Sequence, residues 1–211
     1  MRVLDAAVDA YQRALAIRPD FNEARLGLAK VYSDAGRPGE ALAALDSILK
    51  DSPTDLYARV NRGVILIGLK RTDEGFEELR KAARDNPTST LPLIRLAEAQ
   101  SARKFHAEAA AAYAEAAARE PANASLRHRM GIERSKAGQP AAAEAALKEA
   151  LQLSPDFFLG HLDLGVALAQ QSRFSEAIPE FEAAQRLQPT NSLPRQYLDL
   201  ARKKLQEGGG K

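Results

Sequence analysis

Three polar side chains, Asn61, Arg95 and Arg129, stand 34 residues apart in a chain of 211 residues. Two arginines in corresponding positions can hold a carboxylate or phosphate through paired N–H donors, and an asparagine can pair with a peptide backbone. This spacing predicts a binding site for an acidic group of a partner. The alternative is that both arginines pair with nearby glutamates, such as Glu98 and Glu133, on a solvated surface.

The three histidines, His106, His128 and His161, could serve a metal site or activate a nucleophile only with suitable neighbours. No second metal ligand and no nucleophile accompanies them in a recognisable pattern, and the sequence has no glycine-rich phosphate loop. The absence of cysteine excludes disulfides and thiolate metal sites. We therefore expect no catalytic residue, no metal and no cofactor, and structural roles for the histidines.

The composition argues against two classes of partner. The formal net charge is +2, and the 30 basic and 28 acidic residues are interspersed, so no basic block predicts binding to nucleic acid or to an anionic membrane. No apolar run approaches the roughly 18 residues that membrane insertion requires. The lack of cysteine and of a signal-peptide pattern in the first residues favours a cytoplasmic location.

The elements that must position these side chains follow from a repeat. Six prolines stand at constant intervals of 34 residues: Pro19, Pro53, Pro87, Pro121, Pro155 and Pro189. Within residues 22–55, two stretches with apolar residues at helical spacing flank the helix-breaking sequence Gly36-Arg37-Pro38-Gly39. Each repeat is therefore predicted to be a hairpin of two helices, and the chain a stack of such hairpins.

Small and large residues occupy fixed positions when each repeat is numbered from 1 to 34, with Asn22 at position 1. Positions 8 and 20 of the five complete repeats hold Gly or Ala, position 24 holds Leu, Tyr or Phe, and position 32 holds Pro. Stretches such as Leu28-Ala29-x-x-Tyr32 and Leu164-Gly165 thereby resemble the tetratricopeptide repeat, up to about Leu205. The resemblance implies an all-α, right-handed superhelical solenoid of helix-turn-helix units that acts as a non-catalytic interaction scaffold.

The repeat also predicts the domain organisation. Residues 1–21 are the second helix of an incomplete repeat. Five complete repeats follow, at residues 22–55, 56–89, 90–123, 124–157 and 158–191. The chain then has a C-terminal capping helix at residues 192–206 and a flexible tail at residues 207–211. The capping role rests on Asp199, a carboxylate at position 8, where a second helix would need Gly or Ala. The unpaired helix in residues 1–21 indicates either a fragment of a longer array or a surface through which copies associate.

In this family the free face of each first helix, at positions 2, 6, 9 and 13, lines a concave groove. With the neighbouring position 5, this face gives the expected partner-binding residues: Tyr57, Val60, Asn61, Val64, Leu91, Ile94, Arg95, Glu98, His128, Arg129, Leu159, Leu162 and Val166. We expect a protein or peptide partner, held by apolar contacts and by an acidic group near Arg95 and Arg129. The Lys and Asn with which some family members hold a chaperone carboxylate, at positions 5 and 9, are absent.

Two other functions stay open on the sequence alone. One is self-assembly through the unpaired N-terminal helix, and the other is a regulatory segment of a larger protein whose catalytic domain lies elsewhere. Position 4 is unusual for the family because it holds arginine or histidine in most repeats, for example Arg59 and His161. We expect the long arginine stems to cover apolar surface while their charged heads reach water.

Overall fold

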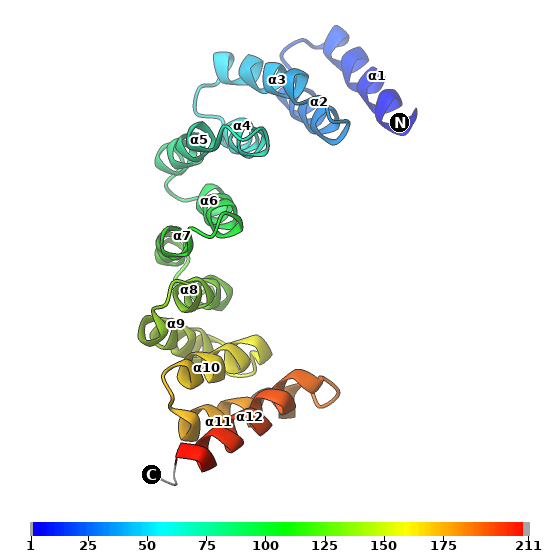
Figure 1. Cartoon of the computed structure of the whole chain (residues 1–211). Helices are drawn as coiled ribbons and strands as arrows, with labels where there is room; N and C mark the ends of the chain where they lie inside the picture. The colour runs from blue at the N-terminus through cyan, green and yellow to red at the C-terminus, as the bar shows by residue number, and fades with distance from the viewer. Residues whose placement is uncertain (1, 209–211) are drawn as a thin grey trace. The chain divides into compact units, whose positions relative to one another are not determined.

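A computed structural model describes residues 2–208, which form twelve α-helices and no strand (Figure 1). In chain order the helices are α1 (Arg2–Ile17), α2 (Asn22–Asp34), α3 (Pro38–Asp51), α4 (Leu56–Gly68), α5 (Thr72–Asp85), α6 (Leu91–Ala102), α7 (His106–Arg119), α8 (Ala124–Lys136), α9 (Pro140–Leu153), α10 (Phe158–Gln170), α11 (Phe174–Leu187) and α12 (Ser192–Gly208). The predicted all-α class is confirmed. Helix α12 extends beyond the predicted capping helix to Gly208, and residues 209–211 of the predicted tail lie outside the described residues.

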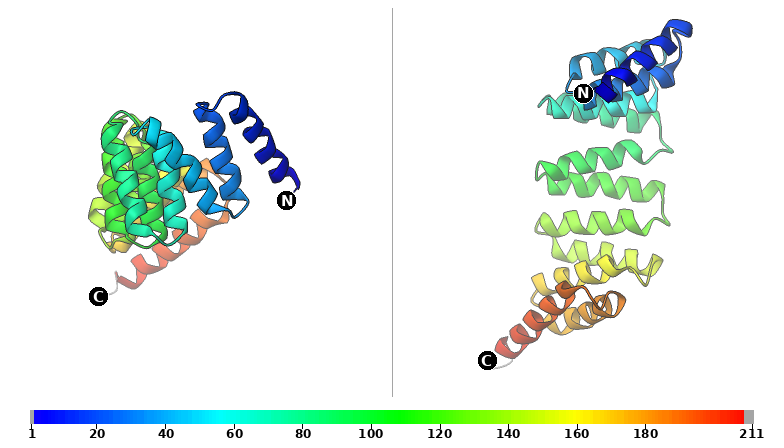
Figure 2. Two further views of the ribbon diagram at one scale, coloured as in Figure 1. Left: turned by 90° about the horizontal axis from the view of Figure 1, so that it is seen from above. Right: turned by 90° about the vertical axis from the view of Figure 1, so that its right-hand side faces the viewer.

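The chain divides into two compact units between Ala99 and Gln100, a point within α6. In each compact unit the two helices of a repeat pack against each other: α2 with α3 and α4 with α5 in the first, α8 with α9 and α10 with α11 in the second. First helices of consecutive repeats also touch, as α2 does with α4 and α10 with α12. Figure 2 shows the helices of the second compact unit following one another in chain order.

A left-handed residue at position 15 ends the first helix of every complete repeat. Its φ lies between 60° and 73° at Gly36, Lys70, Lys104, Gly138 and Ser172. The next N–H then donates to a carbonyl five residues earlier, 2.8 Å away for Arg37 to Tyr32 and 3.1 Å away for Arg173 to Leu168. This is the hydrogen bond of a Schellman cap, which satisfies a carbonyl that the helix would leave unpaired. The helix break predicted at Gly36 is therefore present in all five repeats, including the three that lack glycine there.

The alternation of small and large residues forms the core of each hairpin. Ala41 at position 20 and Leu45 at position 24 are fully buried, and Phe181 is 1% exposed. A Cβ added to Gly165 would lie 2.5 Å from the Phe181 ring. The ring can pack against the helix at this point because Gly165 has no side chain. Full burial of a Leu or Phe side chain contributes about 2 kcal/mol, so these positions hold the two helices together.

The arginine and histidine side chains at position 4 are anchored between the helices. Arg59 is only 5% exposed, and its guanidinium contacts Glu78 (3.3 Å), Asp85 (3.5 Å) and the carbonyl of Pro53. His161 makes the corresponding contacts, with Nδ1 2.7 Å from Glu180 and Nε2 2.8 Å from the carbonyl oxygen of Pro155. The expectation that these charged heads reach water is wrong for Arg59, because acids on the second helix and a proline carbonyl surround its guanidinium.

Helix α1 carries the residues of a second helix but buries them less than the complete repeats do. Ala7, Tyr11 and Ala14 are half-buried, whereas the corresponding Ala41 and Leu45 have no exposed surface. The Tyr11 ring lies over Gly27 of α2, where an added Cβ would come within 2.4 Å of it. Helix α1 thus packs on the following repeat while part of its apolar face stays accessible.

Candidate functional site

The exposed face of α4 presents a stripe of predicted site residues. Tyr57, Asn61 and Val64 follow each other at spacings of four and three, so one side of the helix carries all three. Tyr57 is 59% exposed and Val64 is 45% exposed, although both are large and apolar enough to belong in a core. Asn61 and Val64 also line a pocket of about 200 Å³ between α2 and α4, here called the α2–α4 pocket, together with Ala29, Lys30, Ser33, Asp34 and Ile65.

Helix α6 carries four predicted site residues on its part before Ala99. Arg95 is exposed and donates to Glu98 across 2.9 Å, one turn further along the helix. This is the pairing that the alternative interpretation of the sequence describes. Leu91 and Ile94 are half-buried beside it. Arg95 and Glu98 thus form a surface ion pair, which contributes at most about 1 kcal/mol to stability. A carboxylate of another molecule can therefore replace Glu98 as the partner of Arg95.

Position 5 belongs to the core in three repeats. Val60 is 3% exposed, Leu162 is 5% exposed and His128 is 5% exposed, so these predicted groove residues do not lie on an accessible face. His128 shows the reason, because its Nε2 lies 2.7 Å from the Asp163 carboxylate on the first helix of the next repeat. Its ring also meets the Phe157 ring edge-on at 4.7 Å. Position 5 therefore faces the neighbouring repeat, while positions 2, 6 and 9 face outward.

Arg129, on the exposed side of α8, is placed by an aromatic residue of the preceding repeat. Its Nη1 donates to the Tyr113 hydroxyl across 3.3 Å, and its guanidinium carbon lies 6.0 Å from the centre of the Tyr113 ring. Tyr113 itself is 4% exposed and belongs to the core. A cation held against a buried phenol has few accessible rotamers, so less entropy is lost when it binds an anion.

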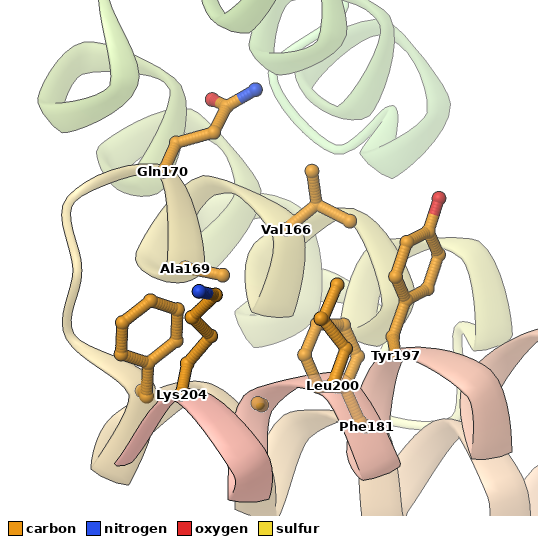
Figure 3. Close-up of a pocket in the computed structure, with 9 residues that line it drawn as sticks. Val166, Ala169, Gln170, Phe181, Tyr197, Leu200 and Lys204 are labelled. Atoms are coloured by element: carbon orange, nitrogen blue, oxygen red, sulfur yellow. The ribbon is translucent and has the colours of Figure 1, made fainter. Parts of the chain in front are cut away.

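An apolar pocket of about 280 Å³ opens between α10 and α12, here called the α10–α12 pocket (Figure 3). Its walls are Val166, Ala169, Gln170, Phe174, Phe181, Tyr197, Leu200, Ala201 and Lys204. The Phe181 and Tyr197 rings stack with their centres 5.4 Å apart, and Leu200 leaves 53% of its surface exposed. Of the predicted site residues only Val166 contributes, while the exposed Leu159 lies on the same helix.

Sequence reasoning missed most of this pocket, although the repeat register contained part of it. Leu200 and Lys204 stand at positions 9 and 13 of α12, on the face that the register assigns to partner binding. Continuing the register into the last helix would have identified both. Phe174 could not be found in this way, because it belongs to the second helix of its repeat and reaches the pocket only through the packing of the hairpin.

Two buried carboxylates join neighbouring repeats in the second compact unit. Hydrogen bonds from Lys148 (2.7 Å), Gln171 (3.0 Å) and Arg173 (2.5 Å) outweigh the effect of burial and lower the pKa of Glu144 to about 2. Burial raises the pKa of Glu133, but the net shift is downward because His106, Lys136 and Ser101 hydrogen-bond to it. Both acids stay charged at neutral pH.

Two kinds of feature are absent from the described part of the chain. Within residues 2–208, no three side chains of the His, Cys, Asp and Glu types are grouped as a metal site would require. In the same residues, each helix lacks the length or the apolar character needed to cross a bilayer. The accessible features of the same residues include apolar stripes, pockets and exposed ion pairs.

Two models of the tetratricopeptide repeat match the sequence, over residues 4–61 and 128–192. The fold is similar to that of YrrB, a TPR protein with an unusual peptide-binding site, with a TM-score of 0.68 and 16% identity over 90% of this chain and 97% of YrrB. It is also similar to MamA, with a TM-score of 0.64 and 19% identity over 77% of this chain and 95% of that one. A form of MamA from Desulfovibrio magneticus RS-1 matches with a TM-score of 0.64 and 18% identity, covering 81% of this chain and 96% of its own.

Proposed function

We propose that this chain, which belongs to the tetratricopeptide repeat family, binds a peptide segment of a partner protein along the exposed faces of its first helices. A non-catalytic interaction scaffold is the general role that the family and the fold support. The observation that carries the peptide proposal is the set of large apolar side chains left exposed at positions 2 and 9. Tyr57, Val64, Leu159 and Leu200 expose 45–59% of their surface there. Large apolar side chains left exposed in this way are typical of interaction sites.

Acidic groups of the partner are proposed to pair with Arg95 and Arg129. The guanidinium of Arg95 is held by an exposed carboxylate, Glu98, which a partner's carboxylate can replace at little cost. Arg129 is oriented by Tyr113 on the exposed side of α8. Apolar contacts at positions 2 and 9 would supply affinity, and the arginines at position 6 would favour acidic sequences.

A selection from a random peptide library with the full chain as bait tests this function. The peptides recovered are expected to combine apolar and acidic residues. The double variant Arg95→Glu with Arg129→Glu should lower the affinity for a recovered peptide about tenfold or more. Each substitution removes a charge-assisted hydrogen bond to the peptide's acidic group and introduces a repulsion. Arg80→Glu with Arg186→Glu is the matched control, since it makes the same change of charge on second helices.

The two parts of the proposal fail in different ways. If the library yields no binder for the wild-type chain, peptide binding itself is wrong. If peptides are recovered but both double variants weaken them equally, the arginines at position 6 have no specific role. The same binding role would apply in a larger protein that used these repeats as a regulatory segment.

A further inference from the structure

The two pockets on the first-helix faces occupy the same place in the repeat. The α2–α4 pocket is lined from positions 8, 9, 12 and 13 of one first helix and 6, 9 and 10 of the next. The α10–α12 pocket is lined from positions 9, 12 and 13 of one first helix and 6, 9, 10 and 13 of the next. The fold therefore builds a hollow at the seam between consecutive first helices, and the sequence decides what each hollow can hold.

The two hollows differ in how polar their linings are. The α2–α4 pocket contains Lys30, Asp34 and Asn61, all of which hydrogen-bond well to water. At the corresponding positions 9 and 13 of α10 and 6 of α12, the α10–α12 pocket has Val166, Gln170 and Tyr197. Phe174 and Phe181 of α11 add aromatic surface, so water in this pocket finds few partners and is easily displaced by an apolar group.

A single basic side chain lies at the edge of the apolar pocket. Figure 3 shows Lys204 extending from α12 toward Ala169 of α10, so that its nitrogen stands beside the opening. The Lys204 ammonium lies 2.8 Å from Glu207, and both side chains are about half exposed (50% and 49%). An exposed ion pair one turn apart on a helix is weak, so the carboxylate of a ligand can take the place of Glu207.

We propose that the α10–α12 pocket accepts one bulky apolar side chain of a partner peptide, and that Lys204 pairs with a carboxylate on the adjacent residue. The volume of about 280 Å³ accommodates an aromatic or long aliphatic side chain. The stacked rings of Phe181 and Tyr197 provide a flat surface against which an aromatic ring can pack. The inference rests on the proposed peptide-binding function and adds to it the chemistry of one subsite: an aromatic or large aliphatic residue next to Asp or Glu.

Three blocked tetrapeptides test the subsite directly on the full chain. They are acetyl-Gly-Phe-Glu-Gly-amide, its Phe-Lys counterpart and its Ala-Glu counterpart, each titrated while the methyl NMR signals of Val166 and Leu200 are followed. The Phe-Glu peptide is expected to shift both signals saturably. The Phe-Lys peptide should bind about threefold more weakly, because it exchanges an exposed ion pair for a repulsion. The Ala-Glu peptide should cause no saturable shift.

Two variants and one control at exposed or half-exposed positions show where the peptide binds. Leu200→Lys places a charged side chain at the edge of the pocket, at a half-exposed position. It should abolish the change that the Phe-Glu peptide causes in the Val166 methyl signal. Leu153→Lys on α9 is the matched control, since Leu153 is 43% exposed outside the pocket, and it should leave binding unchanged. Lys204→Glu should reverse the order of the Phe-Glu and Phe-Lys peptides. Circular dichroism checks that each variant keeps the helix content of the wild type.

Each contrary result removes a defined part of the inference. A Phe-Glu shift that survives Leu200→Lys, or that never reaches Val166 and Leu200, overturns the pocket as the subsite. Equal binding of Phe-Glu and Phe-Lys, or an order unchanged by Lys204→Glu, overturns the role of Lys204. Peptides selected from the random library that bind Leu200→Lys as well as wild type would leave the proposed function standing while the subsite fails.

Discussion

Charged residues of this chain act as structural links between helices as well as surface groups. Arg59 is buried against two acids and a proline carbonyl, and Glu144 joins the repeat at 124–157 to Gln171 and Arg173 of the next. Removing the partners of a charge that stays buried lowers the free energy of unfolding by several kcal/mol, because the charge is then neither paired nor hydrated. The polar residues found at unusual positions of the repeat are therefore part of its packing.

Glu144 gives this idea a pH dependence. Its pKa of about 2 in the folded chain lies below the roughly 4.3 of an unfolded glutamate. The charged Glu144 therefore stabilises the fold fully above about pH 4.3, and this contribution is lost as the pH falls toward 2. Glu144→Gln is expected to lower the free energy of unfolding by about 1–2 kcal/mol at pH 7, and the difference from wild type should vanish near pH 2. Urea unfolding followed by circular dichroism measures both values.

The control for this prediction is Glu149→Gln on the same helix. Glu149 pairs with Arg127 at 3.2 Å but its side chain is 54% exposed, so its loss should change stability by less than about 0.5 kcal/mol. A Glu144→Gln deficit that is the same at pH 7 and at pH 2 would mean that the amide disturbs packing and that charge pairing contributes nothing.

At the scale of the helices, the left-handed residue at position 15 is the feature that every complete repeat shares. It allows the chain to reverse and lets the second helix lie against the first. Glycine adopts this conformation freely, whereas Lys70, Lys104 and Ser172 adopt it at a cost of about 1 kcal/mol each. The Schellman hydrogen bond and the packing of the hairpin outweigh that cost.

Ser172→Gly is expected to stabilise the chain by about 0.5–1 kcal/mol, since it relieves the strain without removing a contact that the core needs. Gly36→Ala should destabilise it by about 1 kcal/mol for the same reason, as nothing lies within 4 Å of the added methyl group and only the backbone is strained. Thermal unfolding of both variants provides the comparison.

Gly39→Ala, which also adds a methyl group in open space but lies within α3, should not destabilise the chain. A loss there equal to that of Gly36→Ala would contradict the argument.

At the scale of the molecule, the sequence was sufficient for the helix hairpins and for most of the outward face, because both follow from periodicity. The proline interval follows the succession of helix pairs, and Tyr57 and Val64, at positions 2 and 9, are exposed. The burial of Val60 and His128 was not predictable in this way, since it depends on how far one repeat rotates against the next. The α10–α12 pocket depends on the same packing and on the second-helix residue Phe174.

The accessible apolar face of α1 makes a prediction about oligomeric state. If copies associate through it, the mass measured by light scattering should rise with concentration, because Val3 (82% exposed) and the half-buried Tyr11 would be covered in the assembly. Val3→Lys should then restore the monomer mass, whereas Leu69→Lys, at an exposed leucine of the first compact unit, should not. A monomer mass at all concentrations of the wild type would exclude self-association.

The links between repeats also determine how the chain reaches its fold. The side-chain hydrogen bonds described within residues 2–208 join residues at most 35 apart, as His128 and Asp163 or Ser135 and Gln170 do. A chain whose contacts are this local loses little entropy in closing loops, and its contact order is low. Its hairpins can form as soon as about two repeats have left the ribosome, so folding can proceed from either compact unit and keep pace with synthesis.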